Sequence, residues 1–477
     1  MANGWQQRWQ GRSPGWTIAI AATILFLFSS LRHGLLESNA WDLGIFDQPL
    51  YLLSRGLPPI STVINVHILG DHAAWIFYPL SVLYRIYPDV HWLFAVQAIA
   101  LASGVLPTRA LAQQAGLSAE LARAIATAYL LYPLIFNLNL FDFHPEVIAL
   151  PLFLTAVWAA RARQLGVFVL CVVVILGCRD ALSLTVAAMG VWLAGWERRR
   201  LYGAIALVAG LVWFVIATQW IIPHYQPAGV LGTSHFAEFG SSIPEILVNL
   251  LLRPDILLRK LFTLANLGYL LLLLLPLGWG LTWRSLTPLI AAAPQLAINL
   301  ISSSVALKDL VHQYSLPILP FLLLSAIAAL VNGRAWIWQP RRIVLWSLVG
   351  FLALAQYPLF WTRYLARIDT WAASRAAIAQ VRTDGAVLAP AAIVPHLTHR
   401  LTIKVLAEPT IRIEDFDYLL LNRRHPGRLS SPAAVDQLIQ QTTNDPNFQA
   451  QVQQDDVYLF SRPQIDVATD TASSSPL

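Results

Sequence analysis

Charged residues, cysteine and methionine are all scarce in this sequence. Only 12% of its 477 residues are charged, whereas 57% are hydrophobic, and the mean hydropathy is +0.57. This balance excludes a soluble globular protein, and the long apolar runs predict a polytopic membrane protein. Eighteen Trp against two Met fit extensive membrane–water interfaces, where an indole ring is buried while its N–H finds a polar partner.

The two cysteines, Cys171 and Cys178, lie in one apolar run about two helical turns apart. This spacing suits neither a disulfide nor a metal site, so both are predicted to be small core residues. The sequence also lacks a Walker-type glycine loop, a G-x-S-x-G elbow, a C-x-x-C pair and an H-E-x-x-H motif. Hydrolysis of a soluble nucleotide at a standard site is therefore unsupported, and in a chain of this class the net charge of +6 does not indicate a nucleic acid partner.

Eleven apolar segments are candidates for membrane spans, since a helix needs ~20 mostly apolar residues to cross a bilayer and fewer where it is packed inside a bundle. They lie near residues 16–36, 90–110, 121–140, 147–161, 164–178, 180–196, 201–222, 261–281, 285–302, 313–331 and 341–362. Arg8 and Arg12 precede the first segment, and no small-residue cleavage site follows it. An uncleaved first helix is therefore expected.

Residues 73–88 are apolar but short, and they contain Pro79 and Arg85. If this stretch lies along the interface instead of spanning, every short basic loop falls on the side of the N-terminus, as the positive-inside rule requires. Those loops are at 109–123, 161–163, 197–200, 283–285 and 332–342. The pattern predicts a cytoplasmic N-terminus, an extracytoplasmic C-terminus and acids and histidines collected on the outer face.

The tail from about residue 365 has a different pattern. A helix over 366–381 is followed by short apolar stretches typical of strands, at 385–390, 400–406, 416–422 and 456–461, with a helix near 432–441. We expect a small α/β domain at 365–464 outside the membrane. The polar, low-complexity end at 465–477 is expected to be disordered.

Two carboxylates stand beside the first apolar segment, in "WDLGIFDQ". The spacing of the apolar residues predicts a helix with Asp42 as its N-cap and Asp47 five residues further on. One interpretation is an interfacial helix with a capping and a solvated Asp. The other is that one carboxylate faces a cavity as a general base or a metal contact.

Other polar groups gather in the loops on the same predicted side. "HILGDH" places His72 beside Asp71, without a strong ligand spacing, so a polar loop and a metal contact both remain open. "FDFHPE" would put Asp142, His144 and Glu146 on one face if it is extended, and such groups at a helix junction must be hydrated or paired.

Residues that could bind an anionic group lie beside two further spans. Arg179 and Asp180 follow Cys178, either as a salt bridge that caps the next helix or with Arg179 neutralising a phosphate. "KDLVHQY" supplies Lys308, His312 and Tyr314, which suit an anionic headgroup.

Taken together, "WDLGIFDQ", "FDFHPE", the Asp-containing break near 180 and "HQYSLPILPFL" make the chain resemble a prokaryotic family of membrane proteins of unknown function that is grouped with the GT-C superfamily of glycosyltransferases. The resemblance covers nearly the whole chain. It implies a multi-spanning helical bundle with amphipathic helices and a catalytic acid in the first external loop, 37–89. Together with the charge pattern of the loops, this predicts an all-α polytopic bundle of about eleven spans over residues 1–364. By position Asp42 matches that acid best and Asp47 second.

Members of the superfamily transfer a sugar from a polyprenyl-phosphate donor to a lipid, glycan or protein outside the cytoplasm. The family pattern near residue 180 is Lys-Glu-Asp, so only Asp180 carries over, and a phosphate role for Arg179 depends on its chemistry alone. We expect a multi-pass protein of the cell membrane with this activity, in which Asp42 or Asp47 accepts a proton or binds Mg²⁺ or Mn²⁺. Asp42, His72 and Glu146 are the candidate metal ligands. The alternatives are a transporter or flippase, which predicts inverted repeats, and a non-catalytic scaffold or sensor.

Overall fold

The computed structural model describes residues 14–229, 232–407 and 412–463, so the N-terminal Arg8 and Arg12 and the predicted tail at 465–477 lie outside it. The chain divides into two compact units, Met1–Leu365 and Ala366–Leu477. We call them the helical unit and the sheet unit.

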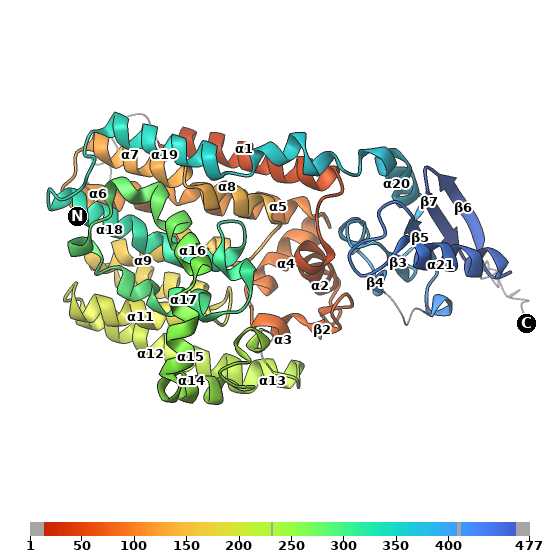
Figure 1. Ribbon diagram of the computed structural model, residues 1–477, viewed down its shortest axis with the longest axis horizontal. Coiled ribbons are helices and arrows are strands. Elements are labelled where there is room, and N and C mark those ends of the chain that lie inside the picture. Colours follow the sequence, from red (N-terminus) through yellow and green to blue (C-terminus); the bar gives the residue numbers. More distant parts are fainter. Residues whose placement is uncertain (1–13, 230–231, 408–411, 464–477) are drawn as a thin grey trace, which may run out of the picture. The chain divides into compact units, whose positions relative to one another are not determined.

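The helical unit is a bundle whose neighbours in sequence mostly pack on one another. α1 packs on α5, α6 on α7, α9 on α10 and α11 on α12, and α19 returns from the end of the unit to lie beside α7 (Figure 1). The bundle helices are α1 (Pro14–Gly34), α5 (His91–Ser103), α6 (Val105–Gln114), α7 (Ala119–Leu130), α8 (Pro133–Leu140), α9 (Glu146–Arg161), α10 (Leu165–Leu176), α11 (Leu182–Gly195), α12 (Arg200–Ile216), α16 (Leu264–Leu274), α17 (Leu289–Ile301), α18 (Leu319–Val331) and α19 (Pro340–Leu354).

Short elements join these helices. They are the π-helical turns η2 (Ala40–Gly44) and η3 (Ala217–Ile221), the strands β1 (Ile60–Ser61) and β2 (Val66–His67), the helices α2 (Ile45–Ser54), α3 (Ile68–His72), α4 (Phe77–Ile86), α13 (Ile222–Tyr225), α14 (Ile243–Leu252) and α15 (Pro254–Leu261), and the 3-10 turns η4 (Thr233–Phe236), η5 (Leu275–Gly280), η6 (Trp283–Ser285), η7 (Val305–Lys308), η8 (Gln313–Ile318), η9 (Tyr357–Trp361) and η10 (Arg363–Leu365).

Among the described residues, five helices are long and apolar enough to cross a membrane: Gly15–Gly34, His91–Gln114, Ala119–Leu140, Arg200–Tyr225 and Gln313–Val331. Two bent pairs raise this to seven if each is one span, Pro254–Leu261 with Leu264–Gly280 at 56° and Pro340–Leu354 with Tyr357–Leu365 at 42°. The other predicted spans are shorter helices, such as α10 with 12 residues and α11 with 14. The count of eleven therefore stays a prediction.

The segment 73–88 contains α4, which has only 10 residues. At about 1.5 Å per residue this helix is about 15 Å long, half the thickness of the hydrocarbon core. It packs on α2 inside the first loop.

Small residues let α11 and α12 approach closely. A Cβ built on Gly190 would lie 2.5 Å from the backbone N of Leu207, and one on Gly210 would lie 2.5 Å from the carbonyl O of Ser183. Both glycines therefore remove side-chain volume at the contact, as is common between membrane helices.

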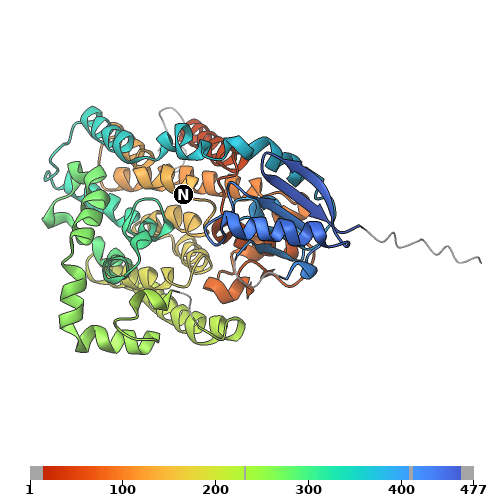
Figure 2. The same cartoon turned by 45° about the vertical axis from the view of Figure 1, so that its right-hand side comes forward.

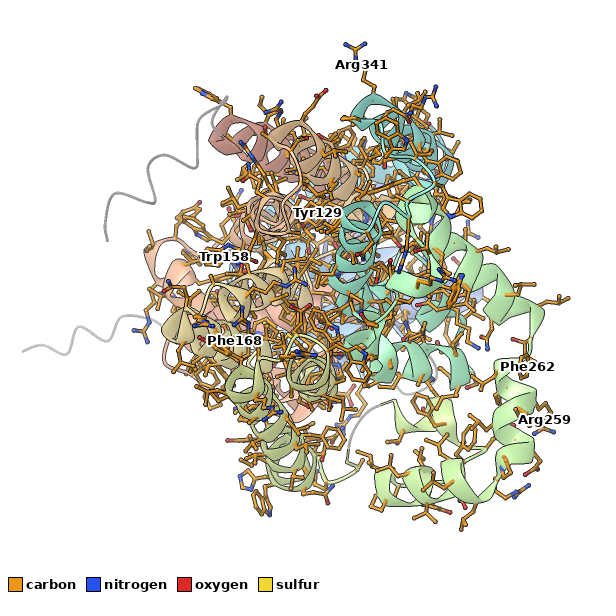
Figure 3. All side chains as sticks on the ribbon, turned by 90° about the vertical axis from the view of Figure 1, so that its left-hand side faces the viewer. Tyr129, Trp158, Phe168, Arg259, Phe262 and Arg341 are labelled. Atoms are coloured by element: carbon orange, nitrogen blue, oxygen red, sulfur yellow. The ribbon has the colours of Figure 1, made fainter. Side chains whose placement is uncertain are left out.

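Farther along the chain, Phe262 is 83% exposed and points away from the bundle at its edge (Figure 3). Both cysteines are free and buried, as predicted.

The sheet unit contains a five-stranded sheet of order β4-β3-β5-β7-β6, in which β4, β3 and β5 are parallel and β7 and β6 antiparallel to their neighbours (Figure 2). Its elements are α20 (Ile368–Gln380), β3 (Val387–Ala389), the turn η11 (Val394–His396), β4 (Ile403–Val405), the turn η12 (Ile413–Asp415), β5 (Tyr418–Asn422), α21 (Pro432–Asn444), β6 (Gln449–Gln454) and β7 (Val457–Ser461). The four predicted strands and both predicted helices are confirmed. β6 was missed.

Successive side chains of β5 point to opposite faces of this sheet, and each face packs against one helix. Asn422 donates to the Thr370 hydroxyl of α20, 2.9 Å away. Leu419 and Leu421, which point to the opposite face, join Val435 and Leu438 of α21 in one apolar cluster.

Candidate active site

Two cavities of the helical unit share part of their walls. The smaller, of about 240 Å³, lies against η2, α3 and the start of α9, and carries Asp42, Asp71 and His144. The larger, of about 400 Å³, is lined mostly by Leu, Ile and Phe from α11, α12, α14 and α17. Five residues line both: His72, Glu146, Arg179, Gln313 and Tyr314. A polar cavity therefore adjoins an apolar one, and charged side chains lie where they meet.

Asp42 lies inside the π-helical turn η2, a kind of turn that is frequent at functional sites. The prediction that Asp42 caps a helix is wrong, because Asn39 is the capping residue and its side-chain oxygen accepts from the N–H of Trp41 at 3.4 Å. The Asn39 amide also donates to Oδ2 of Asp42 at 2.9 Å. One Asn thus fixes both the turn and the carboxylate.

The carboxylate of Asp42 has an unusual proton affinity. Burial, together with the negative charge of Asp142, raises the pKa of Asp42 from 3.8 to about 7, although Arg32, His312 and the Asn39 hydrogen bond act against the rise. A carboxylate with a pKa near neutrality can accept a proton at physiological pH and release it again.

Asp142 organises the surroundings of Asp42 from the "FDFHPE" loop. Its Oδ1 accepts from Arg32 of α1 at 2.6 Å, and its Oδ2 accepts from the backbone N–H of Asn39 at 3.0 Å. The backbone of Asp142 has φ +85°, a left-handed conformation that costs free energy for a residue with a side chain. These hydrogen bonds hold the loop in that conformation, and Asn39 transmits its position to Asp42.

His144 faces Asp42 across the smaller cavity, with Nε2 3.8 Å from Oδ1. Its Nδ1 lies 3.4 Å from the carbonyl O of Asp142. Burial lowers the pKa of His144 to about 4, so the ring is neutral at physiological pH and this contact is not an ion pair. A neutral imidazole beside Asp42 does not compete with it for a proton at physiological pH.

Arg179 and Glu146 form an ion pair in the wall that both cavities share. Glu146 is the first residue of α9, whereas Arg179 comes from the turn between α10 and α11. The guanidinium also lies over the ring of Tyr314, 5.3 Å from its centroid. Tertiary packing thus gives Arg179 a partner other than Asp180, which the salt-bridge interpretation of the sequence had paired with it.

Asp180 instead pairs with His72, whose Nδ1 lies 3.2 Å from Oδ1 of Asp180 and whose Nε2 lies 3.6 Å from Oδ1 of Asp71. Burial and Arg179 oppose protonation of this ring, but the two carboxylates outweigh them and raise the pKa of His72. His72 is therefore the histidine of the site in which a positive charge is favoured.

Three predicted residues lie outside both cavity walls: Asp142, whose contacts are given above, Asp47 and His312. Asp47 is 1% exposed and accepts a hydrogen bond from the hydroxyl of Tyr84 in α4. His312 directs Nδ1 to Oδ2 of Asp309 at 2.6 Å and packs against Phe141. Gln313 and Tyr314, which follow His312 in the chain, line both cavities.

Sequence reasoning missed Arg32, Asn39 and Gln313. An arginine inside an apolar span is costly unless paired, and that signal was available for Arg32. No pattern marks Asn39 or Gln313, because each matters through contacts that tertiary structure makes.

The predicted metal ligands Asp42, His72 and Glu146 all line the smaller cavity. Within residues 14–229, 232–407 and 412–463, however, no group of three or more His, Cys, Asp or Glu side chains is placed to hold one metal ion. The carboxylate of Glu146 is already paired with Arg179. The side chains in this arrangement do not fit a metal site, so the chemical step proposed below involves no metal ion.

Comparison with solved structures shows the fold of the whole chain. The structure of ArnT from Cupriavidus metallidurans in the apo state matches 96% of this chain and 98% of that chain, with 12% sequence identity and a TM-score of 0.54. The structure of ArnT from the same organism bound to undecaprenyl phosphate matches 98% and 99%, with 12% identity and a TM-score of 0.46. At this identity, the likeness to apo ArnT shows that the chain shares its fold.

No curated protein matches the sequence. A family model with the description "Predicted membrane protein (DUF2079)" matches residues 32–459, from the end of α1 to the last strand. The chain belongs to the DUF2079 family of predicted membrane proteins.

Proposed function

We propose that this protein is a membrane glycosyltransferase that moves a sugar from a polyprenyl-phosphate donor to an acceptor hydroxyl outside the cytoplasm. The observation that supports this best is Asp42, a single carboxylate with a pKa of about 7 on the wall of a polar cavity that adjoins an apolar one. A lipid-linked sugar has the same two parts, an apolar chain and a polar head. The GT-C-like fold agrees with this substrate class.

In the proposed step, Oδ1 or Oδ2 of Asp42 accepts the proton of the acceptor hydroxyl. The hydroxyl oxygen forms a bond to the anomeric carbon, while the bond from that carbon to the phosphate oxygen breaks and its electron pair leaves with the polyprenyl phosphate. This single displacement inverts the anomeric centre. Arg179 in the shared wall and protonated His72 stabilise the leaving phosphate by charge.

The membrane arrangement belongs to the same proposal. The basic loops favour a cytoplasmic N-terminus, about eleven spans and the sheet unit on the outer side, where lipid-linked sugars and their lipid, glycan or protein acceptors would meet. Asp180 holds His72, and Asp142 holds Asn39 and thereby Asp42. His312 and the metal ion stay predictions of the sequence, and the proposed step uses neither.

The experiment is transfer of label from radiolabelled polyprenyl-phosphate sugars to a membrane extract by the purified full-length protein. Asp42→Asn should lower the rate by roughly 10²- to 10⁴-fold, the usual worth of a general base. Asp89→Asn is the matched control, because Asp89 lies in the same loop but is exposed and pairs with His91. If Asp42→Asn and the wild type, both correctly inserted, transferred sugar at equal rates, Asp42 would not be the base. Absence of transfer from every donor by the wild type would refute the proposed function.

A further inference from the structure

Gln313 occupies a position in both cavities that the proposed step does not use. It is the first residue of η8, directly before α18. It is 6% exposed, and it lines the polar and the apolar cavity together with Arg179 and Tyr314. A ligand with its head in one cavity and its chain in the other would pass this residue.

The amide oxygen of Gln313 is buried and has no hydrogen-bond partner among the described residues. Burying an acceptor without a donor costs free energy, and native proteins rarely leave one in this state without a functional reason. The amide oxygen of another buried glutamine, Gln48, accepts from the backbone N–H of Thr62 at 2.8 Å. The amide oxygen of Gln97 also lacks a partner among the described residues, but Gln97 lines neither cavity, so of these glutamines Gln313 is the one that has its orphaned oxygen on a residue of the cavity wall. The orphaned oxygen of Gln313 therefore indicates a donor that a ligand supplies.

The kind of donor follows from the chemistry of the head group. A phosphate diester that links lipid and sugar carries only acceptor oxygens at neutral pH, so it cannot satisfy an amide oxygen. Arg179, on the same wall, is the group suited to that phosphate. A sugar, in contrast, presents several hydroxyl groups, each of which can donate. The wall thus offers one group for the phosphate and one for the sugar.

We infer that Gln313 accepts a hydrogen bond from a hydroxyl of the donor sugar and thereby selects the sugar that is transferred. The inference rests on the proposed function and adds to it the residue that distinguishes a sugar-linked lipid from the bare lipid phosphate. A site built to bind a hydroxyl discriminates against a ligand that lacks it, because the buried acceptor is then left unpaired.

The test is equilibrium binding of undecaprenyl phosphate and of a panel of undecaprenyl-phosphate hexoses and pentoses to the purified full-length protein. For the sugar lipid that the wild type binds most tightly, Gln313→Met should weaken binding roughly five- to tenfold, the worth of about one hydrogen bond. Binding of undecaprenyl phosphate should not change. Gln313→Glu keeps an acceptor at the same place and should keep the preference for the sugar lipid.

Gln97→Met is the matched control. Gln97 is fully buried in α5 and its amide oxygen also lacks a partner among the described residues, but it lines neither cavity. This substitution should leave the ratio of the two affinities unchanged even if it lowers stability.

The outcomes separate the two proposals. If the wild type prefers a sugar lipid and Gln313→Met keeps the full preference, the role of Gln313 is refuted and the proposed function stands. If Gln313→Met weakens both lipids equally, the residue acts on the phosphate or on folding, and the inference again fails. If the wild type shows no preference for any sugar lipid over undecaprenyl phosphate, the proposed donor fails and the inference fails with it.

Discussion

Replacing Asp42 by Asn should stabilise the folded protein at neutral and alkaline pH while it removes transfer. In the folded chain the pKa of Asp42 is about 7, against an ordinary value of 3.8. The folded state therefore binds this proton more tightly than the unfolded state does, and the wild type loses stability as pH rises from about 4 to about 7. Above about pH 7 the loss is complete.

The size of the effect follows from the same two values. A difference of about three pH units, at about 1.4 kcal/mol per unit, corresponds to about 4 kcal/mol of unfolding free energy. Asn has the same shape and can still accept the hydrogen bond from Asn39, but it does not titrate. The stability difference between Asp42→Asn and the wild type should thus grow by about 3 kcal/mol between about pH 5 and about pH 8.

Thermal unfolding of both proteins in one detergent, over a series of pH values and at one scan rate, measures this difference. The melting temperature of Asp42→Asn should rise relative to that of the wild type as pH increases, whereas Asp89→Asn, on an exposed side chain, should follow the wild type. A constant offset between Asp42→Asn and the wild type across the series would refute the argument that burial raises the pKa of Asp42.

Three further predictions concern the surroundings of Asp42. The pH profile of kcat/KM for transfer should be bell-shaped: kcat/KM rises through a midpoint near 7 as Asp42 loses its proton, and falls where His72 loses the proton that stabilises the leaving phosphate; a profile that is flat from about pH 5 to 9 would contradict both roles. Asn39→Ala should raise that midpoint by roughly half to one pH unit, because it removes a hydrogen bond that stabilises the deprotonated carboxylate of Asp42. An unchanged midpoint would mean that Asn39 does not act on Asp42. Gly177→Ala should lower both the melting temperature and donor binding, because its Cβ would lie 2.4 Å from the ring of Trp75, three residues after His72. Gly166→Ala, where the new Cβ meets nothing within 4 Å, should change neither, and equal behaviour of the two variants would show that the contact with Trp75 has no role.

The membrane class of the protein follows from composition alone, because burying ~20 apolar residues in lipid needs no partner beyond the bilayer. The lengths of the helices, in contrast, do not follow from composition. The run at 164–196 was predicted as two spans, and the structure makes it α10 and α11, with 12 and 14 residues joined through Arg179 and Asp180. Arg179 and Asp180 in this turn pair with Glu146 and His72, which lie far away in the sequence, and such pairing is a property of the tertiary structure.

In the sheet unit, too, some elements were predictable from the sequence and one was not. Strands β3, β4, β5 and β7 carry apolar or alternating residues, and their positions were predictable. β6 reads "QAQVQQ", and almost all of its residues are exposed. It is a strand because it pairs with β7 at the edge of the sheet, so its own side chains give little signal.

The sequence by itself determined that acids and histidines gather in a few loops between apolar helices, and it named Asp42 and Asp47 as the candidates of the first loop. The resemblance ranked Asp42 first, but only the tertiary structure showed that the two carboxylates have different surroundings. Five residues apart on a helical path, the two side chains lie on different faces, and the packing of α4 on α2 directs Asp47 to Tyr84, whereas the turn capped by Asn39 directs Asp42 to the cavity. Burial then raises the pKa of Asp42, and burial is decided by residues that lie far away in the sequence.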